Sequence, residues 1–138
     1  MNHKLIVIDT NVLLSAVLSP NGTARQALDK AYQQFKIAQS EETYQELKTR
    51  IYKPKFNKYI SDQDREQFLE VVKKSSQFIE ITSQINICRD PDDHKFLELA
   101  KDCNAEYLIT GDQDLLSLKT LAEYQNQIMT PRDFLAVD

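Results

Sequence analysis

Lys4-Leu-Ile-Val-Ile-Asp-Thr-Asn11 is the stretch from which the fold can be worked out. Leu5 to Ile8 is an unbroken aliphatic run, too short for a helix and without polar alternation, which predicts a strand buried on both faces of a parallel sheet. Ligands of open α/β sheets bind outside the carboxyl ends of the strands, so Asp9 is expected at the edge where chemistry takes place. The alternative is that Asp9 only caps the following helix.

Composition narrows the class of protein. The 138 residues predict one domain, residues 1–138, and the 41% hydrophobic and 28% charged content is typical of soluble proteins. No apolar run approaches the ~20 residues of a membrane span and no signal peptide precedes the first strand, so we expect a cytoplasmic protein without membrane contact. Cys88 and Cys103 lack metal-ligand spacing and are expected to be reduced thiols. The net charge of −4 argues against binding polyanions by bulk electrostatics, but it leaves room for a nucleic-acid enzyme with metal ions in an acidic site.

Strand and helix patterns alternate along the chain, which predicts an α/β fold with a central parallel sheet flanked by helices. Further strands are expected at residues 35–38, 78–81, 107–110 and 128–129. Thr23, Ser40 and Ser61 are expected to begin helices as N-caps. The expected buried side of the helix after Ser61 consists of Phe68, Leu69, Val71 and Val72.

A second informative stretch is Arg89-Asp-Pro-Asp-Asp-His-Lys-Phe-Leu-Glu-Leu-Ala100. Pro91 limits helix formation before it, so a helix is expected to start near Asp92 or Asp93 and to run to Cys103. Asp93 precedes Phe96 and Leu97 by three and four residues and therefore shares their buried face. We interpret Asp93 as functional, whereas Asp90 and Asp92 are expected to cap the helix.

The third stretch, Tyr107-Leu-Ile-Thr-Gly-Asp-Gln-Asp-Leu-Leu116, ends another apolar strand with carboxylates. Asp112 follows the strand at once, Asp114 lies two residues further on, and a short helix is expected at residues 114–118. The alternative is that Asp112 caps that helix while Asp114 sits in its first turn. If Asp9, Asp93 and Asp112 share one sheet edge, their mutual repulsion calls for a divalent cation, and oxygen ligands suit Mg²⁺ or Mn²⁺.

These motifs together resemble a PIN domain, above all the branch regarded as toxins of bacterial toxin–antitoxin pairs. They are Ile8-Asp-Thr-Asn-Val12, a Glu in the helix after Ser40, Asp90-Pro-Asp-Asp93 with its Leu-x-x-Ala helix, and Leu108-Ile-Thr-Gly-Asp112. The resemblance covers essentially the whole chain. It implies a ribonuclease that uses one or two Mg²⁺ or Mn²⁺ ions and leaves 5′-phosphate and 3′-hydroxyl ends. It also implies a small antitoxin partner and a homodimer.

The resemblance assigns roles to individual residues. It places the catalytic, metal-holding quartet on Asp9, Glu46, Asp93 and Asp112, with Asp114 as an accessory metal ligand and Asn11 and Thr110 in support. Without the resemblance, Glu46 would be interpreted as a solvated charge on a helix. The alternative function is a non-catalytic PIN-like module that binds RNA or protein.

A local excess of basic residues offsets the acidic net charge. Residues 48–58 contain five lysines and arginines and no acid, with aromatic side chains interleaved that could stack on bases. Within this segment Lys53 and Lys55 are predicted to contact RNA phosphates. The alternative is that the lysines form a solvated face while Phe56 belongs to the core.

Overall fold

The computed structural model describes residues 3–87 and 90–137. The expectations for Cys88 and for the first two residues lie outside this part of the chain, whereas Cys103 is a half-buried free thiol. No helix in the described part is long and apolar enough to cross a membrane.

Five parallel strands form the central sheet, in the order β3-β2-β1-β4-β5. The α/β class and the parallel sheet predicted from the sequence are thereby confirmed. The strands are β1 (Leu5–Ile8), β2 (Lys36–Gln39), β3 (Ser76–Phe78), β4 (Tyr107–Ile109) and β5 (Ile128–Met129).

The first strand lies in the middle of the sheet, as its unbroken aliphatic run predicts. Ile6 and Ile8 pack into a core with the helices on one face, whereas Val7 packs into a second core on the other face. All three side chains are at most 2% exposed. A strand covered on both sides has no solvated face, which explains why its sequence does not alternate.

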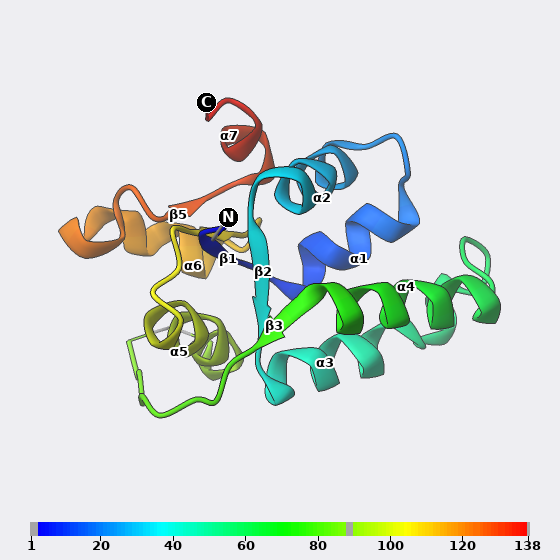
Figure 1. The fold of residues 1–138 in the computed structure, drawn as a ribbon, viewed down its shortest axis with the longest axis horizontal. Coiled ribbons are helices and arrows are strands. Elements are labelled where there is room, and N and C mark those ends of the chain that lie inside the picture. Colours follow the sequence, from blue (N-terminus) through cyan, green and yellow to red (C-terminus); the bar gives the residue numbers. More distant parts are fainter. Residues whose placement is uncertain (1–2, 88–89, 138) are drawn as a thin grey trace.

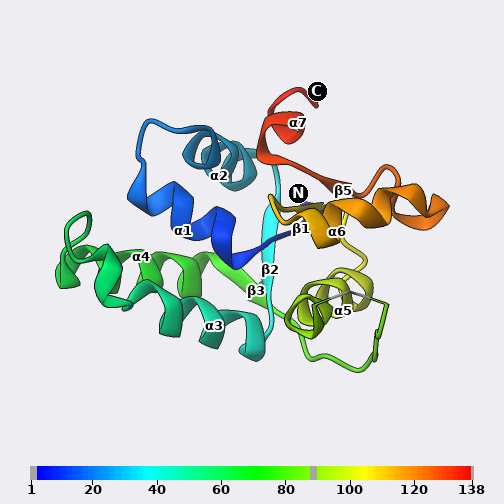
Figure 2. The same cartoon turned by 180° about the vertical axis from the view of Figure 1, so that it is seen from behind.

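The helices are α1 (Thr10–Leu18), α2 (Thr23–Gln34), α3 (Glu41–Ile51), α4 (Asp62–Ser75), α5 (His94–Asp102), α6 (Gln113–Leu116) and α7 (Pro131–Leu135). Short 3-10 turns are η1 (Pro54–Phe56), η2 (Pro91–Asp93), η3 (Ser117–Thr120) and η4 (Ala122–Tyr124). Figures 1 and 2 show α1 to α4 on one side of the sheet and α5 and α6 on the other, with α3 and α4 side by side as a hairpin.

Several helix starts follow the predicted capping chemistry. Ser40 forms a capping box with Thr43, in which each side-chain oxygen accepts the other residue's backbone N–H, at 3.1 and 2.9 Å. The Ser61 hydroxyl caps α4 by accepting from the N–H of Asp64. Thr23 was predicted to cap α2, but Gly22 occupies the N-cap and Thr23 is already the first helical residue.

Two other local predictions were wrong. The strand expected at residues 78–81 is β3 at Ser76–Phe78, because α4 ends at Ser75 and the chain pairs with β2 immediately afterwards. Val71 was expected in the core, yet it is 47% exposed because α4 buries only one stripe, which includes Leu69 and Val72. In addition, the helix expected at residues 114–118 is divided between α6 and the 3-10 turn η3.

The strand order creates a crevice at the carboxyl edge of the sheet. From β1 the chain proceeds to β2 and β3 on one side, and then crosses to place β4 on the other side of β1. Connections from β1 and β4 therefore leave in different directions, which opens a site between their carboxyl ends. Asp9 follows β1 directly, and Thr110 and Asp112 follow β4.

Candidate metal centre at the carboxyl edge of the sheet

Asp9 is fixed by hydrogen bonds from two elements. Its Oδ1 accepts the N–H of Val12 at 2.9 Å, which makes it the N-cap of α1, and its Oδ2 accepts the hydroxyl of Thr110. The same Thr110 oxygen accepts the N–H of Asp112 at 2.9 Å. The capping role considered for Asp9 is therefore real. It coexists with a tie between β1 and β4, which Thr110 makes from a fully buried position.

Asp112 is positioned in a similar way. Its Oδ1 accepts the N–H of Asp114 at 2.7 Å and caps the short helix α6. This capping bond holds Asp112 and Asp114 close together at the end of β4. The cap and the acidic cluster are thus built from the same residues, so the capping alternative does not remove Asp112 from the site.

Asp93 differs from the other acids because its carboxylate Oδ2 is buried without a hydrogen bond in the described chain to compensate the loss of water. It ends the 3-10 turn η2, is 7% exposed, and its side chain does not cap α5. The capping bond goes instead to Asp90, which accepts the N–H of Asp92 at 3.0 Å. Within the described chain, the buried Oδ2 of Asp93 has no hydrogen-bond partner. A buried charged oxygen without a partner is costly, and its position indicates a cation site.

Asp93, Asp112 and Asp114 form a group whose carboxylate oxygens, one from each residue, lie within 4.8 Å of one another. Desolvation, reinforced by the charges of Asp112, Asp90, Asp114 and Asp9, raises the pKa of Asp93 to about 7. Converging carboxylate oxygens of this kind, on residues that include Asp93 with its Oδ2 lacking a hydrogen bond in the described chain, fit a hard divalent cation such as Mg²⁺ or Mn²⁺.

Asp9 feels the same environment less strongly. Burial raises its pKa to about 6, while the hydrogen bonds from Thr110 and Val12 act in the opposite direction. The charges of Asp112 and Glu46 add to the increase. Asp9 after β1, Glu46 on α3 and Asp112 after β4 therefore interact electrostatically, although they are far apart in the sequence.

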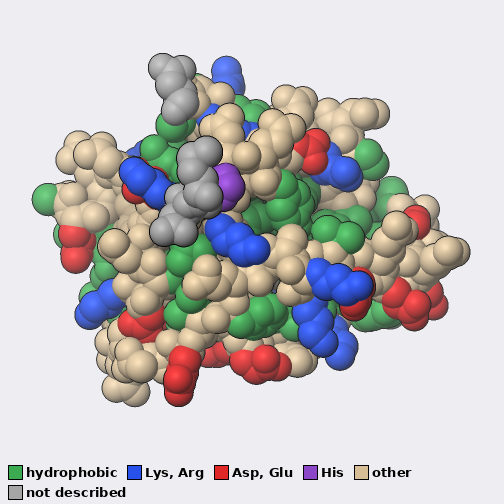
Figure 3. Space-filling view, in the orientation of Figure 1, with side chains coloured by type: hydrophobic (Ala, Val, Ile, Leu, Met, Phe, Trp, Pro, Cys, Tyr) green, Lys and Arg blue, Asp and Glu red, His purple; other side chains and the backbone are tan. Residues whose placement is uncertain are grey.

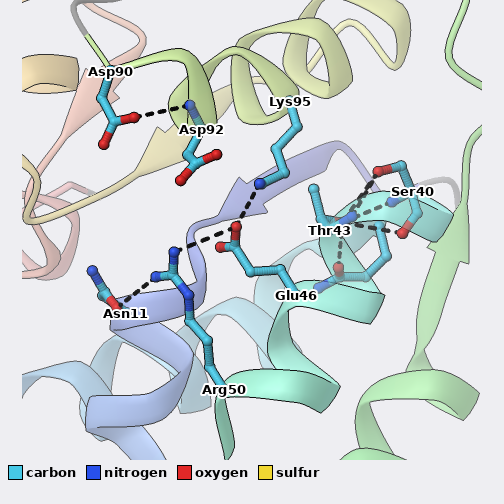
Figure 4. Close-up of polar contacts among 9 residues, drawn as sticks. Asn11, Ser40, Thr43, Glu46, Arg50, Asp90, Asp92 and Lys95 are labelled. Carbon is cyan, nitrogen blue, oxygen red and sulfur yellow. Dashed lines mark hydrogen bonds and ion pairs between the residues drawn. The ribbon is translucent and has the colours of Figure 1, made fainter.

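Glu46 reaches the same region from α3, but its carboxylate is held by cations. Lys95 Nζ lies 2.5 Å from Glu46 Oε2, and Arg50 Nη2 lies 3.6 Å from the same oxygen. Arg50 also donates from Nη1 to Asn11 Oδ1 at 3.3 Å. Figure 4 shows Glu46 between Lys95, which descends from α5, and Arg50, which extends to Asn11 on α1.

A small pocket of about 110 Å³ joins these groups. Its lining is mostly acidic and comes from α1, α3, the η2 turn, α5 and the N-cap residues of α1, η2 and α6: Asp9, Thr10, Asn11, Glu46, Arg50, Asp90, Asp92, Asp93, Phe96 and Asp112. All four acids of the quartet suggested by the resemblance line it, so the fold brings them together.

Lys53 and Lys55 lie elsewhere. They are exposed at and just before η1, beyond the end of α3, and among the described residues that line the acidic pocket neither appears. Lys55 instead extends over the ring of Phe56, with its Nζ 5.2 Å from the ring centroid. Figure 3 shows one face of the molecule, on which basic side chains are interspersed with acidic ones instead of forming one continuous patch.

Lys95 was not singled out by sequence reasoning. Its partner Glu46 is 49 positions away in the sequence and lies on another helix, so no local pattern could show the pair. The Arg50–Glu46 ion pair could have been predicted from the sequence, because residues four apart on a helix lie on the same face.

Comparison with known proteins identifies the family. A family model described as PIN domain matches residues 5–114, from β1 through the acids that follow β4. The chain therefore belongs to the PIN domain family. It is also 34% identical over 139 aligned positions to uncharacterized protein MJ1680 of Methanocaldococcus jannaschii, covering 94% of this chain and 88% of that protein.

Solved structures agree with this fold. VapBC2 from Rickettsia felis, solved bound to a DNA fragment from the promoter, contains a chain similar to this one with a TM-score of 0.59 and 16% identity, covering 91% of this chain and 96% of that one. PAE2754 from Pyrobaculum aerophilum gives a TM-score of 0.60 and 14% identity, covering 96% of this chain and 88% of that one.

Proposed function

We propose that this protein is a metal-dependent endoribonuclease. The observation that carries the proposal is the buried Oδ2 of Asp93, which has no hydrogen-bond partner among the described residues, on a carboxylate that forms a group with Asp112 and Asp114. Asp93, Asp112 and Asp114 would hold Mg²⁺ or Mn²⁺. When bound, such an ion would activate water and stabilise negative charge on a phosphodiester.

The chain's own residues would supply position and charge. Asp9 accepts hydrogen bonds from Val12 and Thr110. It would therefore lie beside the ion ligands and fix the end of β1 against the end of β4. Arg50 lines the pocket with a side chain that is 31% exposed and would attract the phosphate of an incoming RNA strand. Lys53 and Lys55 would bind the strand further along, outside the pocket.

Cleavage of a labelled single-stranded RNA tests this proposal. We expect cutting in Mg²⁺ or Mn²⁺, none in excess EDTA, and products with 5′-phosphate and 3′-hydroxyl ends. Asp93→Asn should abolish cutting, whereas the control Asp29→Asn, an exposed acid on α2, should cut normally. Equal activity in EDTA would exclude a metal-dependent reaction. RNA binding without cleavage in either metal would instead favour the alternative of a non-catalytic binding module.

We also propose that the protein acts in the cytoplasm as the toxin of a toxin–antitoxin pair. The support is the family, together with the similarity of fold to a chain of VapBC2 from Rickettsia felis. Induced expression should arrest growth, Asp93→Asn should not, and the product of a small neighbouring reading frame should copurify and restore growth. Normal growth at high expression of a nuclease shown to be active would contradict the toxin role. Light scattering during gel filtration would test the expected homodimer.

A further inference from the structure

We propose that a hollow beside the candidate metal centre binds the nucleoside next to the phosphate that is cut. The hollow, called the Gly111 hollow below, is lined in part by Asn11, Ser15, Ala24, Gly111, Asp112 and Pro131. This inference rests on the proposed function and adds the path of the substrate. Single-stranded RNA would leave the acidic pocket along α1, toward the starts of α2 and α7.

The Gly111 hollow is continuous with the acidic pocket and is built by several elements. The two share Asn11 on α1 and Asp112 at the end of β4. On the far side, Ala24 comes from the first turn of α2 and Pro131 begins α7. Because α2 packs against both α1 and α7, this wall is held by three helices and not by a single loop (Figures 1 and 2).

The sizes of the two spaces indicate what each can hold. The acidic pocket has a volume of about 110 Å³, which suits an ion and a phosphate but not the nucleosides on either side of that phosphate. The Gly111 hollow has about 260 Å³. It combines apolar surface from Ala24 and Pro131 with polar groups from Asn11 and Ser15, which lie one helical turn apart on α1. Such a mixed lining suits the ribose and base of one unstacked nucleotide.

Gly111 gives a second, independent indication. The chain has two glycines, and at Gly22 an added Cβ would lie 3.3 Å from the backbone oxygen of Ser19. At Gly111 an added Cβ would meet no described atom within 4 Å, and no glycine in the described chain has a positive φ. Neither crowding nor backbone conformation in the described chain therefore requires a glycine at this position. A glycine also lets a ligand approach the backbone closely, and we assign that role to Gly111.

Filling the hollow from two elements tests the assignment. Gly111→Leu and Ala24→Leu each add a side chain to it. The probe is a fluorescein-labelled single-stranded RNA of mixed sequence, with Ca²⁺ in place of Mg²⁺ so that binding is measured without cutting. By fluorescence anisotropy, each variant should bind about tenfold more weakly than wild type. Because both fill one hollow, the double variant should be at most about twofold weaker than the weaker single variant.

Matched controls separate this effect from changes in the fold or in the metal site. Ala122→Leu, at an exposed position in η4, should bind RNA within about twofold of wild type. Ala24 is not among the described residues that line the acidic pocket, so Ala24→Leu should keep the Mn²⁺ affinity of wild type, measured by electron paramagnetic resonance. Circular dichroism would verify the fold of each variant.

The two glycines provide a further pair with opposite expectations. Gly111→Ala should melt at or above the wild-type temperature, because alanine restricts the unfolded chain, and should still bind RNA more weakly. Gly22→Ala should melt at a lower temperature, because alanine is a poor N-cap, and should bind RNA as wild type does when folded. If both leucine variants unfold, Gly111→Ala decides the question alone.

The outcomes distinguish this inference from the proposed function. If a wild type that cuts RNA is matched in RNA binding by the folded filling variants, or if their effects multiply in the double variant, the Gly111 hollow is not a subsite and the nuclease proposal stands. If the wild type binds RNA without cutting it in Mg²⁺ or Mn²⁺, and filling still weakens binding, the nuclease proposal fails and the subsite stands. A wild type that neither binds nor cuts RNA would overturn both.

Discussion

At the scale of single residues, Asp93 differs from the neighbouring acids in how little its burial is compensated by hydrogen bonds. Asp9, Asp90 and Asp112 each accept a backbone N–H, so their burial or position is compensated locally. For Asp93, Oδ2 is buried among like charges without such a bond in the described structure. Its ionisation is thus disfavoured in the folded protein unless a cation is present.

The stability of the metal-free protein should therefore depend on pH through Asp93. Its pKa is about 7 in the fold against an ordinary value of 3.8, so between these values the folded state binds more protons than the unfolded state. The free energy of unfolding should consequently fall as pH rises from about 4 to about 7, and this loss should level off above the folded pKa. Asp9, with a pKa raised to about 6, acts in the same direction.

Asp93→Asn isolates the contribution of this residue. In EDTA, the melting temperature of the variant minus that of the wild type should increase from pH 5 to pH 8, because only the wild type must ionise a buried group. Thermal melts followed by circular dichroism at each pH measure this difference. A difference that is constant over the whole range would mean that Asp93 ionises as an ordinary carboxyl does.

At the scale of elements, α3 is important because it carries both Glu46 and Arg50 into the pocket. Its start is fixed by the buried capping box of Ser40 and Thr43. Ser40→Ala should lower the free energy of unfolding by about 1 kcal/mol, whereas Ser40→Gly should cost only a few tenths, because glycine also suits the N-cap. Urea unfolding would measure both. A larger loss for glycine than for alanine would mean that Ser40 contributes through packing instead of capping.

The segment after α3 is predicted to bind RNA through exposed lysines. Lys53→Gln with Lys55→Gln should weaken the binding of single-stranded RNA in EDTA and reduce the slope of log affinity against log salt by about 0.7 per lost phosphate contact. Fluorescence anisotropy over a range of salt concentrations measures both effects. The pair Lys73→Gln/Lys74→Gln, at the end of α4, is a charge-matched control that should leave the slope unchanged. If the two pairs have the same effect, Lys53 and Lys55 act only as general surface charge.

At the scale of the whole molecule, the site exists only in the folded chain, because β1, α3, the η2 turn and β4 each bring part of it. A divalent ion should therefore stabilise the native state. Free Mg²⁺ at 100 times its dissociation constant should add about 2.7 kcal/mol to the free energy of unfolding. Asp93→Asn should show much less stabilisation, whereas Asp29→Asn should respond as the wild type does. Melts at constant ionic strength would measure this, and an equal response in all three proteins would argue against the site.

The sequence by itself determined the alternation of strands and helices and the acids that follow the two central strands. The aliphatic run of β1 could be buried only between two layers, and the carboxyl ends of parallel strands meet at one edge, so Asp9 and Asp112 were predictable neighbours. The position of Asp93 on the buried side of its helix was visible in the spacing of Phe96 and Leu97. These features depend on residues close together in the sequence, so they can be predicted without knowledge of the tertiary structure.

Only the tertiary structure decided which charges compensate one another. Glu46 and Lys95 lie on different helices, and their 2.5 Å contact depends on how α3 and α5 approach the edge of the sheet. The lack of a partner for Asp93 Oδ2 in the described chain, and the hydroxyl of Thr110 that joins Asp9 to the backbone of Asp112, depend on the same packing. Periodicity predicts which face of an element is buried, but the partner that a buried charge finds there is set by contacts between residues distant in sequence.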